Sequence, residues 1–188
     1  MSVLPIRVLG DPILRRRAAT IGTVRDDLRR LADNMYETMY AAKGIGLAAP
    51  QVGVSERLFI TDVDGARYVM IDPELVSVVA ATDVSEEGCL SIPEVLGDVR
   101  RPSSIVMRAI DLKGEPITID ASGMLARCMQ HELDHLEGRL FIDHLSFLKR
   151  RHSLADWAKL EKDFPGHIRM LTPGYPGDPD RGRPTEEL

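Results

Sequence analysis

The chain has very few cysteines and no long apolar run. Its 188 residues contain only Cys89 and Cys128, so at most one disulfide could form and a disulfide scaffold is excluded. Each cysteine is better interpreted as a free thiol or a metal ligand in a reducing compartment. No run of about 18 apolar residues occurs, and the first twelve residues lack the pattern of a signal peptide. We therefore expect a cytoplasmic protein that does not enter a membrane.

An excess of positive charge is also absent. The 24 Lys and Arg residues face 29 Asp and Glu residues, which gives a net charge of -5 and does not suit binding to a phosphate backbone. We therefore expect no specific DNA binding. One basic run, KRRH at residues 149–152, is the exception. It could dock the protein near ribosomal RNA or simply form a solvated helix face, and the sequence leaves both interpretations open.

The composition fits one globular domain. With 44% hydrophobic and 28% charged residues, a chain of this length can bury a substantial core, and no internal repeat is visible. From Pro165 onward there are five prolines and four glycines, which is typical of an irregular or mobile tail. The sequence therefore predicts a domain over residues 1–164 and a tail over residues 165–188.

Helices are predicted on both sides of a strand-rich middle. Apolar residues at helical spacing predict an amphipathic helix over residues 23–43, with Thr23 as its cap, and another over residues 147–162. Between them, β-rich runs begin at residues 57, 66, 74, 104 and 116. Asp64 and Gly65 separate the first two runs, and this pair favours a tight hairpin turn.

A second helix, from Ser122 to Gly138, has few positions suited to water and is expected to be central and buried. It contains HELDH at residues 131–135. A rotation of about 100° per residue leaves His131 and His135 only about 40° apart, on one face. This spacing favours a metal site, although two core histidines would give the same pattern.

The third ligand decides which kind of metal site this is. A catalytic divalent metal usually has three protein ligands and an open position. In the HExxHxxGxxH protease pattern, the third ligand would fall on Phe141, which cannot bind a metal. A thermolysin-like protease would use a later carboxylate, Asp156 or Glu161. Cys128 is a turn before His131 and fits better as a packed thiol than as a ligand.

Three segments occur together and in order: GIGLAAPQ at residues 44–51, EGCLS at 87–91 and QHELDH at 130–135. This set resembles the peptide deformylases. The segments GDPILR and GRLFIDHLS extend the resemblance over about residues 3–150. It implies an α+β fold in which antiparallel sheets surround the histidine helix and a further helix lies near the C-terminus. It also implies a hydrolase that removes the formyl group from the N-terminal formylmethionine of newly synthesised polypeptides and releases formate.

The resemblance assigns roles to individual residues. It implies one divalent metal bound by Cys89, His131 and His135. The metal is expected to be ferrous iron (Fe2+), with Zn2+, Ni2+ or Co2+ able to substitute. Glu132 becomes the catalytic carboxylate that moves a proton from water to the leaving amine. Gln51 and the Leu90 backbone amide become oxyanion donors.

The resemblance also places the peptide substrate. Cys128 and Ile45 would line the pocket for the methionine side chain, and the backbone of Ile45, Gly46 and Gly88 would pair with the peptide as an added strand. The same alignment puts Ser85 and Arg127 near the rim of that pocket. A different class of protein stays open as an alternative. In that case Cys89, Cys128 and the two histidines would form a closed, structural metal site in a binding domain.

Overall fold

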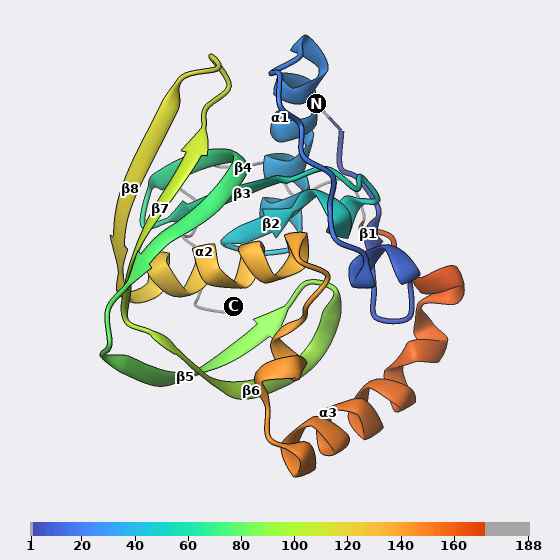
Figure 1. Cartoon of the computed structure of the whole chain (residues 1–188). Coiled ribbons are helices and arrows are strands. Elements are labelled where there is room, and N and C mark those ends of the chain that lie inside the picture. Colours follow the sequence, from blue (N-terminus) through green and yellow to red (C-terminus); the bar gives the residue numbers. More distant parts are fainter. Residues whose placement is uncertain (1, 172–188) are drawn as a thin grey trace.

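Helix α2, Gly123–Leu136, lies between a five-stranded antiparallel sheet and a two-stranded antiparallel ribbon (Figure 1). The structure is a computed structural model and describes residues 2–171. The strands of the large sheet follow the order β2-β3-β4-β7-β8, whereas β5 pairs only with β6. The predicted α+β class, with antiparallel sheets around the histidine helix, is confirmed.

The remaining elements have the following bounds. The other two helices are α1 (Asp26–Ala41) and α3 (Phe147–Leu160). The strands are β1 (Ile6–Arg7), β2 (Gly46–Ala48), β3 (Leu58–Val63), β4 (Ala66–Val78), β5 (Thr82–Cys89), β6 (Ile92–Pro102), β7 (Ser104–Ile110), β8 (Pro116–Ser122) and β9 (Ile168–Arg169). Short 3-10 turns, among them Ala49–Val52 and Phe141–His144, connect some of these elements.

The hairpin between β3 and β4 forms where it was predicted. Asp64 and Gly65 both have positive φ, 52° and 83°, as the tight primed turn requires. Beyond it, the runs expected as separate strands at residues 66 and 74 are one strand of 13 residues. The pairing of β4 moves from β3 to β7 across Pro73 and shifts register there. A proline fits a strand at such an irregularity because no ladder hydrogen bond is required of it.

The ribbon formed by β5 and β6 was not among the β-rich runs predicted from the sequence. Its strands pair from Thr82 with Pro102 to Cys89 with Ile92, with a register shift beside Gly88. Several of its side chains are charged or exposed, so its alternation of apolar residues is weak. The ribbon places Cys89 at its turn, facing α2.

The core consists of apolar side chains on both faces of the large sheet. On strand β3, Phe59 packs toward α2, while Leu58 and Ile60 belong to the cluster around α1. This burial on both faces explains the continuous apolar run of that strand. A third cluster joins the ribbon to α3 and contains Phe141 and Trp157. Most of helix α2 is buried, as its sequence predicted.

One predicted helix boundary is corrected, and the first part of the predicted tail is described. Helix α1 begins at Asp26 with Arg25 as the residue before it, so Thr23 is not its cap. The tail expected from residue 165 begins with a 3-10 turn and strand β9, which pairs with β1. Gly166, with φ 67°, allows the chain to turn back so that the His167 carbonyl accepts from Val8 N–H. Residues 172–188 of the predicted tail lie outside the described residues.

The helices of the described region are too short or too polar for a membrane span. Of residues 2–171, no helix has the length and the apolar content that crossing a bilayer requires.

We predict that Gly138 is required for the chain to turn after α2. Its φ is 71°, and a Cβ there would lie 2.7 Å from the backbone oxygen of Arg15. Gly114 is the matched control because its φ is 85° and nothing lies within 4 Å of its Cβ position. Both alanine variants should lose about 1–2 kcal/mol of unfolding free energy through backbone strain. Gly138→Ala should lose about 1–3 kcal/mol more through the overlap.

Urea unfolding of the two variants and the parent measures this difference. Equal losses for Gly138→Ala and Gly114→Ala would show that the contact with Arg15 does not matter.

Candidate active site

Helix α2 presents two histidines at the surface that faces the ribbon. The rings of His131 and His135 have centroids 5.1 Å apart, and both side chains are buried. His131 also stacks on Phe141, which follows the helix and fills the space beside it. The predicted geometry of two imidazoles on adjacent turns is therefore present.

Cys89 completes a cluster of three possible metal ligands. Its Sγ lies 3.2 Å from Nε2 of His135, and one donor atom from each of Cys89, His131 and His135 lies within 4.8 Å of the others. The turn of the ribbon supplies the thiol and the helix supplies both imidazoles. In the described residues, this is the one group of His, Cys, Asp and Glu with such geometry.

The two cysteines differ in their electrostatic surroundings. Burial raises the pKa of the Cys89 thiol, but the nearby imidazoles, His135 first, outweigh burial and lower this pKa to about 5. Burial raises the pKa of Cys128 well above its ordinary value, and the charge of Glu132 adds to this. The Cys128 thiol lies 3.6 Å from the Ile45 carbonyl oxygen. Cys89 is therefore suited to bind a metal as thiolate, and Cys128 to remain a neutral thiol.

The donor set fits a divalent transition metal. Two imidazole nitrogens and one thiolate are typical ligands of zinc, iron and nickel, and three protein ligands leave a position for water. His131 uses Nδ1 to contact Glu87, so its Nε2 is free to face a metal. Oε2 of Glu132 is buried without a hydrogen-bond partner in the described part of the chain, as expected of a carboxylate that meets water or substrate.

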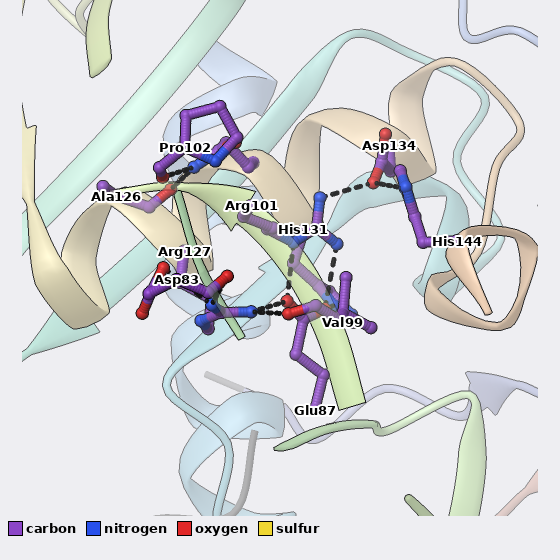
Figure 2. Close-up of polar contacts among 11 residues, drawn as sticks. Asp83, Glu87, Val99, Arg101, Pro102, Ala126, Arg127, His131, Asp134 and His144 are labelled. Carbon is purple, nitrogen blue, oxygen red and sulfur yellow. Dashed lines mark hydrogen bonds and ion pairs between the residues drawn. The ribbon is translucent and has the colours of Figure 1, made fainter. Parts of the chain in front are cut away.

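Glu87 holds His131 from behind. Its Oε2 lies 3.0 Å from Nδ1 of His131, and its two oxygens accept from Arg101 at 2.6 and 2.9 Å (Figure 2). Burial by itself raises the pKa of Glu87, but Arg101 and His131 outweigh it and hold this pKa far below its usual range. A carboxylate that accepts from Nδ1–H fixes the ring and leaves Nε2 as the ligand atom.

Asp134 extends this network away from the metal cluster. It accepts from Arg101 at 2.9 Å and lies 2.7 Å from Nε2 of His144. Burial raises the pKa of Asp134, but His144 and Arg101 lower it to about 2. The sequence motifs contained Glu87 and Asp134 without assigning them roles. His144 lay in the GRLFIDHLS segment, likewise without an assigned role, whereas Arg101 lay in none of the quoted motifs and its partners are distant in the sequence.

Glu132 lies in a low-dielectric position beside the cluster. Burial raises the pKa of Glu132 to about 7, although the two histidines act in the opposite direction. The close approach of Gly46 encloses the carboxylate. A Cβ at Gly46 would lie 2.5 Å from Oε1 of Glu132 and 2.6 Å from Sγ of Cys128. A carboxylate with a pKa near neutrality can both accept and donate a proton.

Gln51 is held in one orientation within the 3-10 turn Ala49–Val52. Its Oε1 accepts from Ala48 N–H at 2.8 Å, which directs Nε2 toward Ser91 Oγ at 3.2 Å and Cys89 Sγ at 3.6 Å. Leu90 occupies the turn of the ribbon next to Cys89. Both residues therefore lie beside the metal cluster.

A pocket opens over these groups. Its lining combines three glycines with the candidate ligands and polar groups: Gly44, Ile45, Gly46, Gln51, Gly88, Cys89, Leu90, His131 and Glu132. Nearly all the residues that the resemblance singled out are therefore adjacent in space. Cys128 lies behind this lining, within reach of both Ile45 and the Gly46 backbone.

Three residues that the sequence offered for the site lie outside the ligand cluster and the pocket lining. Asp156 pairs with Lys159 and His152 on helix α3, and Glu161 lies near His167, so neither belongs to the ligand cluster. Arg127, expected near the pocket rim, has a buried side chain bonded to Glu87 and Asp83 instead. The helix turns Arg127 toward the ribbon because it lies one turn before His131.

Comparison with known proteins gives one consistent result. The family model described as polypeptide deformylase matches residues 3–151. The peptide deformylase of Alkalilimnicola ehrlichii is 51% identical over 155 residues, which cover 80% of this chain and 86% of that protein. The peptide deformylase of Rhizobium meliloti is 44% identical over 167 residues, which cover 86% of this chain and 96% of that protein.

Solved structures agree with the sequence relatives. The peptide deformylase of Legionella pneumophila has a TM-score of 0.81 at 40% identity and covers 86% of this chain and 96% of its own. That of Ehrlichia chaffeensis in complex with actinonin has a TM-score of 0.83 at 37% identity and covers 86% and 99%. The chain therefore belongs to the polypeptide deformylase family.

Proposed function

We propose that Cys89, His131 and His135 bind one divalent metal and that this site removes the formyl group from N-terminal formylmethionine of newly synthesised polypeptides. The observation that carries this proposal is the cluster itself, in which the three donor atoms lie within 4.8 Å of one another in a pocket shared with Glu132. Because formylated chains emerge from ribosomes in the cytoplasm, we place the reaction there.

The chemistry of the ligand set suggests which metal is native. When bound, a divalent metal supplies a Lewis acid that activates water and polarises the formyl oxygen. We propose ferrous iron, as the family resemblance implies. Zinc, nickel and cobalt accept the same nitrogen and sulfur donors and should substitute.

Glu132 is the proton carrier in this proposal. Its carboxylate accepts a proton from the attacking water and then donates it to the amine nitrogen as the C–N bond breaks. The products are formate and a peptide with a free N-terminal methionine. A pKa raised by burial to about 7 suits both steps, because neither protonation state is strongly preferred at neutral pH.

Gln51 and Leu90 stabilise the charge that develops on the formyl oxygen. Gln51 Nε2 is already oriented by the bond from Ala48 N–H to Oε1, so it can donate without reorganisation. The Leu90 backbone N–H adds a second donor in the turn beside Cys89. Such donors typically contribute about 3 kcal/mol each to the lowering of the barrier.

The substrate backbone has two sheet edges on which to dock. Within residues 2–171, strand β2 pairs only with β3 and β5 pairs only with β6, so each has an open edge near the pocket. An extended peptide can pair with the backbone of Ile45 and Gly46 on one side and of Gly88 on the other. The methionine side chain then enters the apolar space near Ile45 and Cys128.

Three of the four side chains in the basic run of helix α3, all but Arg151, have an acidic partner in the described residues. Lys149 pairs with Asp98, Arg150 with Asp143, and His152 lies 3.3 Å from Asp156. These contacts favour the interpretation as a solvated helix face over docking to ribosomal RNA.

We predict that Glu132→Gln keeps the metal but loses activity by about a thousandfold or more, because the amide cannot carry the proton. Its unfolding free energy should not fall, since a desolvated carboxylate is replaced by a neutral group. Glu137→Gln is the control, because that residue lies on the C-terminal cap of the same helix, outside the pocket. Formate release from formyl-Met-Ala-Ser and metal content are measured together. Near-normal turnover of Glu132→Gln at full metal content would refute the proton-transfer role.

We predict that Gly46→Ala displaces Glu132 and lowers kcat about a hundredfold, because misplacement by about 1 Å costs that much. A Cβ at this position would overlap both Oε1 of Glu132 and Sγ of Cys128. Cys128→Ala alone should raise KM more than it lowers kcat, because Cys128 borders the space proposed for the methionine side chain. The double variant should remain impaired, because the overlap with the carboxylate persists. Full activity in the double variant would show that only the Cys128 contact matters.

We predict that the iron form loses activity in air while the zinc and nickel forms do not. A thiolate and a ferrous ion with an open position both react with oxygen or peroxide, whereas zinc has no accessible redox change. Protein purified without oxygen, reloaded with each metal and then exposed to air, provides the comparison. If anaerobic protein contains zinc alone with full turnover and the iron form survives air, the iron assignment is wrong.

A further inference from the structure

Arg127 joins helix α2 to both strands of the ribbon. Its side chain is only 3% exposed. Nη1 donates to Oε1 of Glu87 at 2.7 Å and to the Val99 carbonyl oxygen at 3.0 Å, and Nη2 donates to Oδ1 of Asp83 at 3.0 Å (Figure 2). Glu87 and Asp83 belong to β5 and Val99 to β6. One guanidinium therefore connects three elements of the site.

Two arginines share the Glu87 carboxylate but come from different places. Arg101 donates Nε to Oε1 and Nη2 to Oε2, a fork that fixes the plane of the carboxylate. However, Arg101 lies on β6, within the same ribbon as Glu87. Arg127 lies on α2 with His131, so its bond fixes Glu87 relative to the helix that carries the imidazole.

The spacing along α2 places His131 between two such connections. Arg127 is four residues before His131 and Asp134 is three residues after it, so all three lie on one face. Asp134 accepts from Nη1 of Arg101 at 2.9 Å. The ribbon is thus bonded to the helix on both sides of the imidazole. Because Cys89 lies two residues after Glu87 on the same strand, these bonds also set where its thiol meets the two histidines.

We propose that Arg127 is a positioning residue, which holds the ribbon against α2 through Glu87 and thereby sets the geometry of the three metal ligands. The proposal rests on the proposed function of Cys89, His131 and His135 as the metal site.

The role follows from what Glu87 must do for His131. With Nδ1–H donated to Oε2 of Glu87, the imidazole keeps its Nε2 lone pair for the metal. If Arg127 is lost, Oε1 of Glu87 keeps one of its two donors, that from Arg101. The only direct bond between α2 and Glu87 among the described residues is then the one from His131, which is itself a proposed metal ligand. The imidazole and the Cys89 thiol can then move relative to each other, and the metal should leave faster.

The test compares Arg127→Met with Asp83→Asn in the nickel form. Methionine retains the length and packing of the stem without the charge, whereas Asp83→Asn removes only the outer ion pair and leaves the bond to Glu87. With excess chelator, Arg127→Met should release the metal about tenfold faster or more, in the range that partners of metal ligands show. Its kcat should fall with little change in KM. Asp83→Asn should stay within about twofold of the parent.

Spectroscopy and a conservative variant distinguish a role of Arg127 in positioning the metal ligands from a role in stabilising the fold alone. The visible absorption of the cobalt form reports ligand geometry and should shift in Arg127→Met but not in Asp83→Asn. Arg127→Lys should recover part of the metal retention, because an ammonium can contact Glu87 but cannot reach Val99 and Asp83 together. If Arg127→Met does not fold, Arg127→Lys carries the test with the same measurements.

Three other outcomes would overturn either the positioning role of Arg127 or the proposed function. A lower melting temperature with unchanged metal release and an unchanged cobalt spectrum would make Arg127 a structural brace and overturn the proposal. Equal effects of Arg127→Met and Asp83→Asn would also overturn it, because the outer pair would then be responsible. If the parent protein itself binds no metal through Cys89, His131 and His135, the proposed function fails first.

Discussion

The site depends on one buried carboxylate, that of Glu87. It is fully buried, and a carboxylate in such a place is costly unless every lone pair is used and its charge is balanced. Four donor groups from Arg101, Arg127 and His131 meet this requirement. Because these donors come from β6 and α2, satisfying the charge also closes the ribbon onto the helix. The same bonds that make the carboxylate tolerable therefore bring the thiol of Cys89 to the two imidazoles.

Local patterns were sufficient for the parts of the fold that depend on neighbours in sequence. The helical spacing of α2, its burial and the HELDH face follow from periodicity. The turn at Asp64 and Gly65 follows from the tolerance of these two residue types for the positive φ angles that are observed there. The ribbon was not predictable in this way. Its strands carry charged residues whose burial depends on partners more than ten residues away, such as Glu87 with Arg101. Separate runs were expected from residues 66 and 74, yet β4 continues through Pro73 because the strand changes partners there.

Ligands and supporting residues differ in how much the sequence says about them. Three motifs in a fixed order were enough to single out Cys89, although nothing local tied it to His131. Arginines, in contrast, are usually exposed, so residue type predicts neither Arg101 nor Arg127 as buried. Helical spacing could place Arg127 on the same face as His131. It could not say that this face meets Glu87, because that depends on how the ribbon packs.

The contrast between the two buried glutamates explains how one small site can be both rigid and reactive. Glu87 is surrounded by cationic donors, which lower its pKa and keep it charged, so it serves as a fixed acceptor. Glu132, on the same side of α2 as the ligands, has an oxygen without a partner in the described residues, and its pKa is raised to about 7. Leaving that oxygen unpaired lowers stability, but in the proposed mechanism it keeps the carboxylate available to exchange a proton with water or substrate. Leu47 and Ala48, which follow Gly46 on β2, pack into the two apolar clusters of the large sheet and so keep the Gly46 backbone close to Glu132.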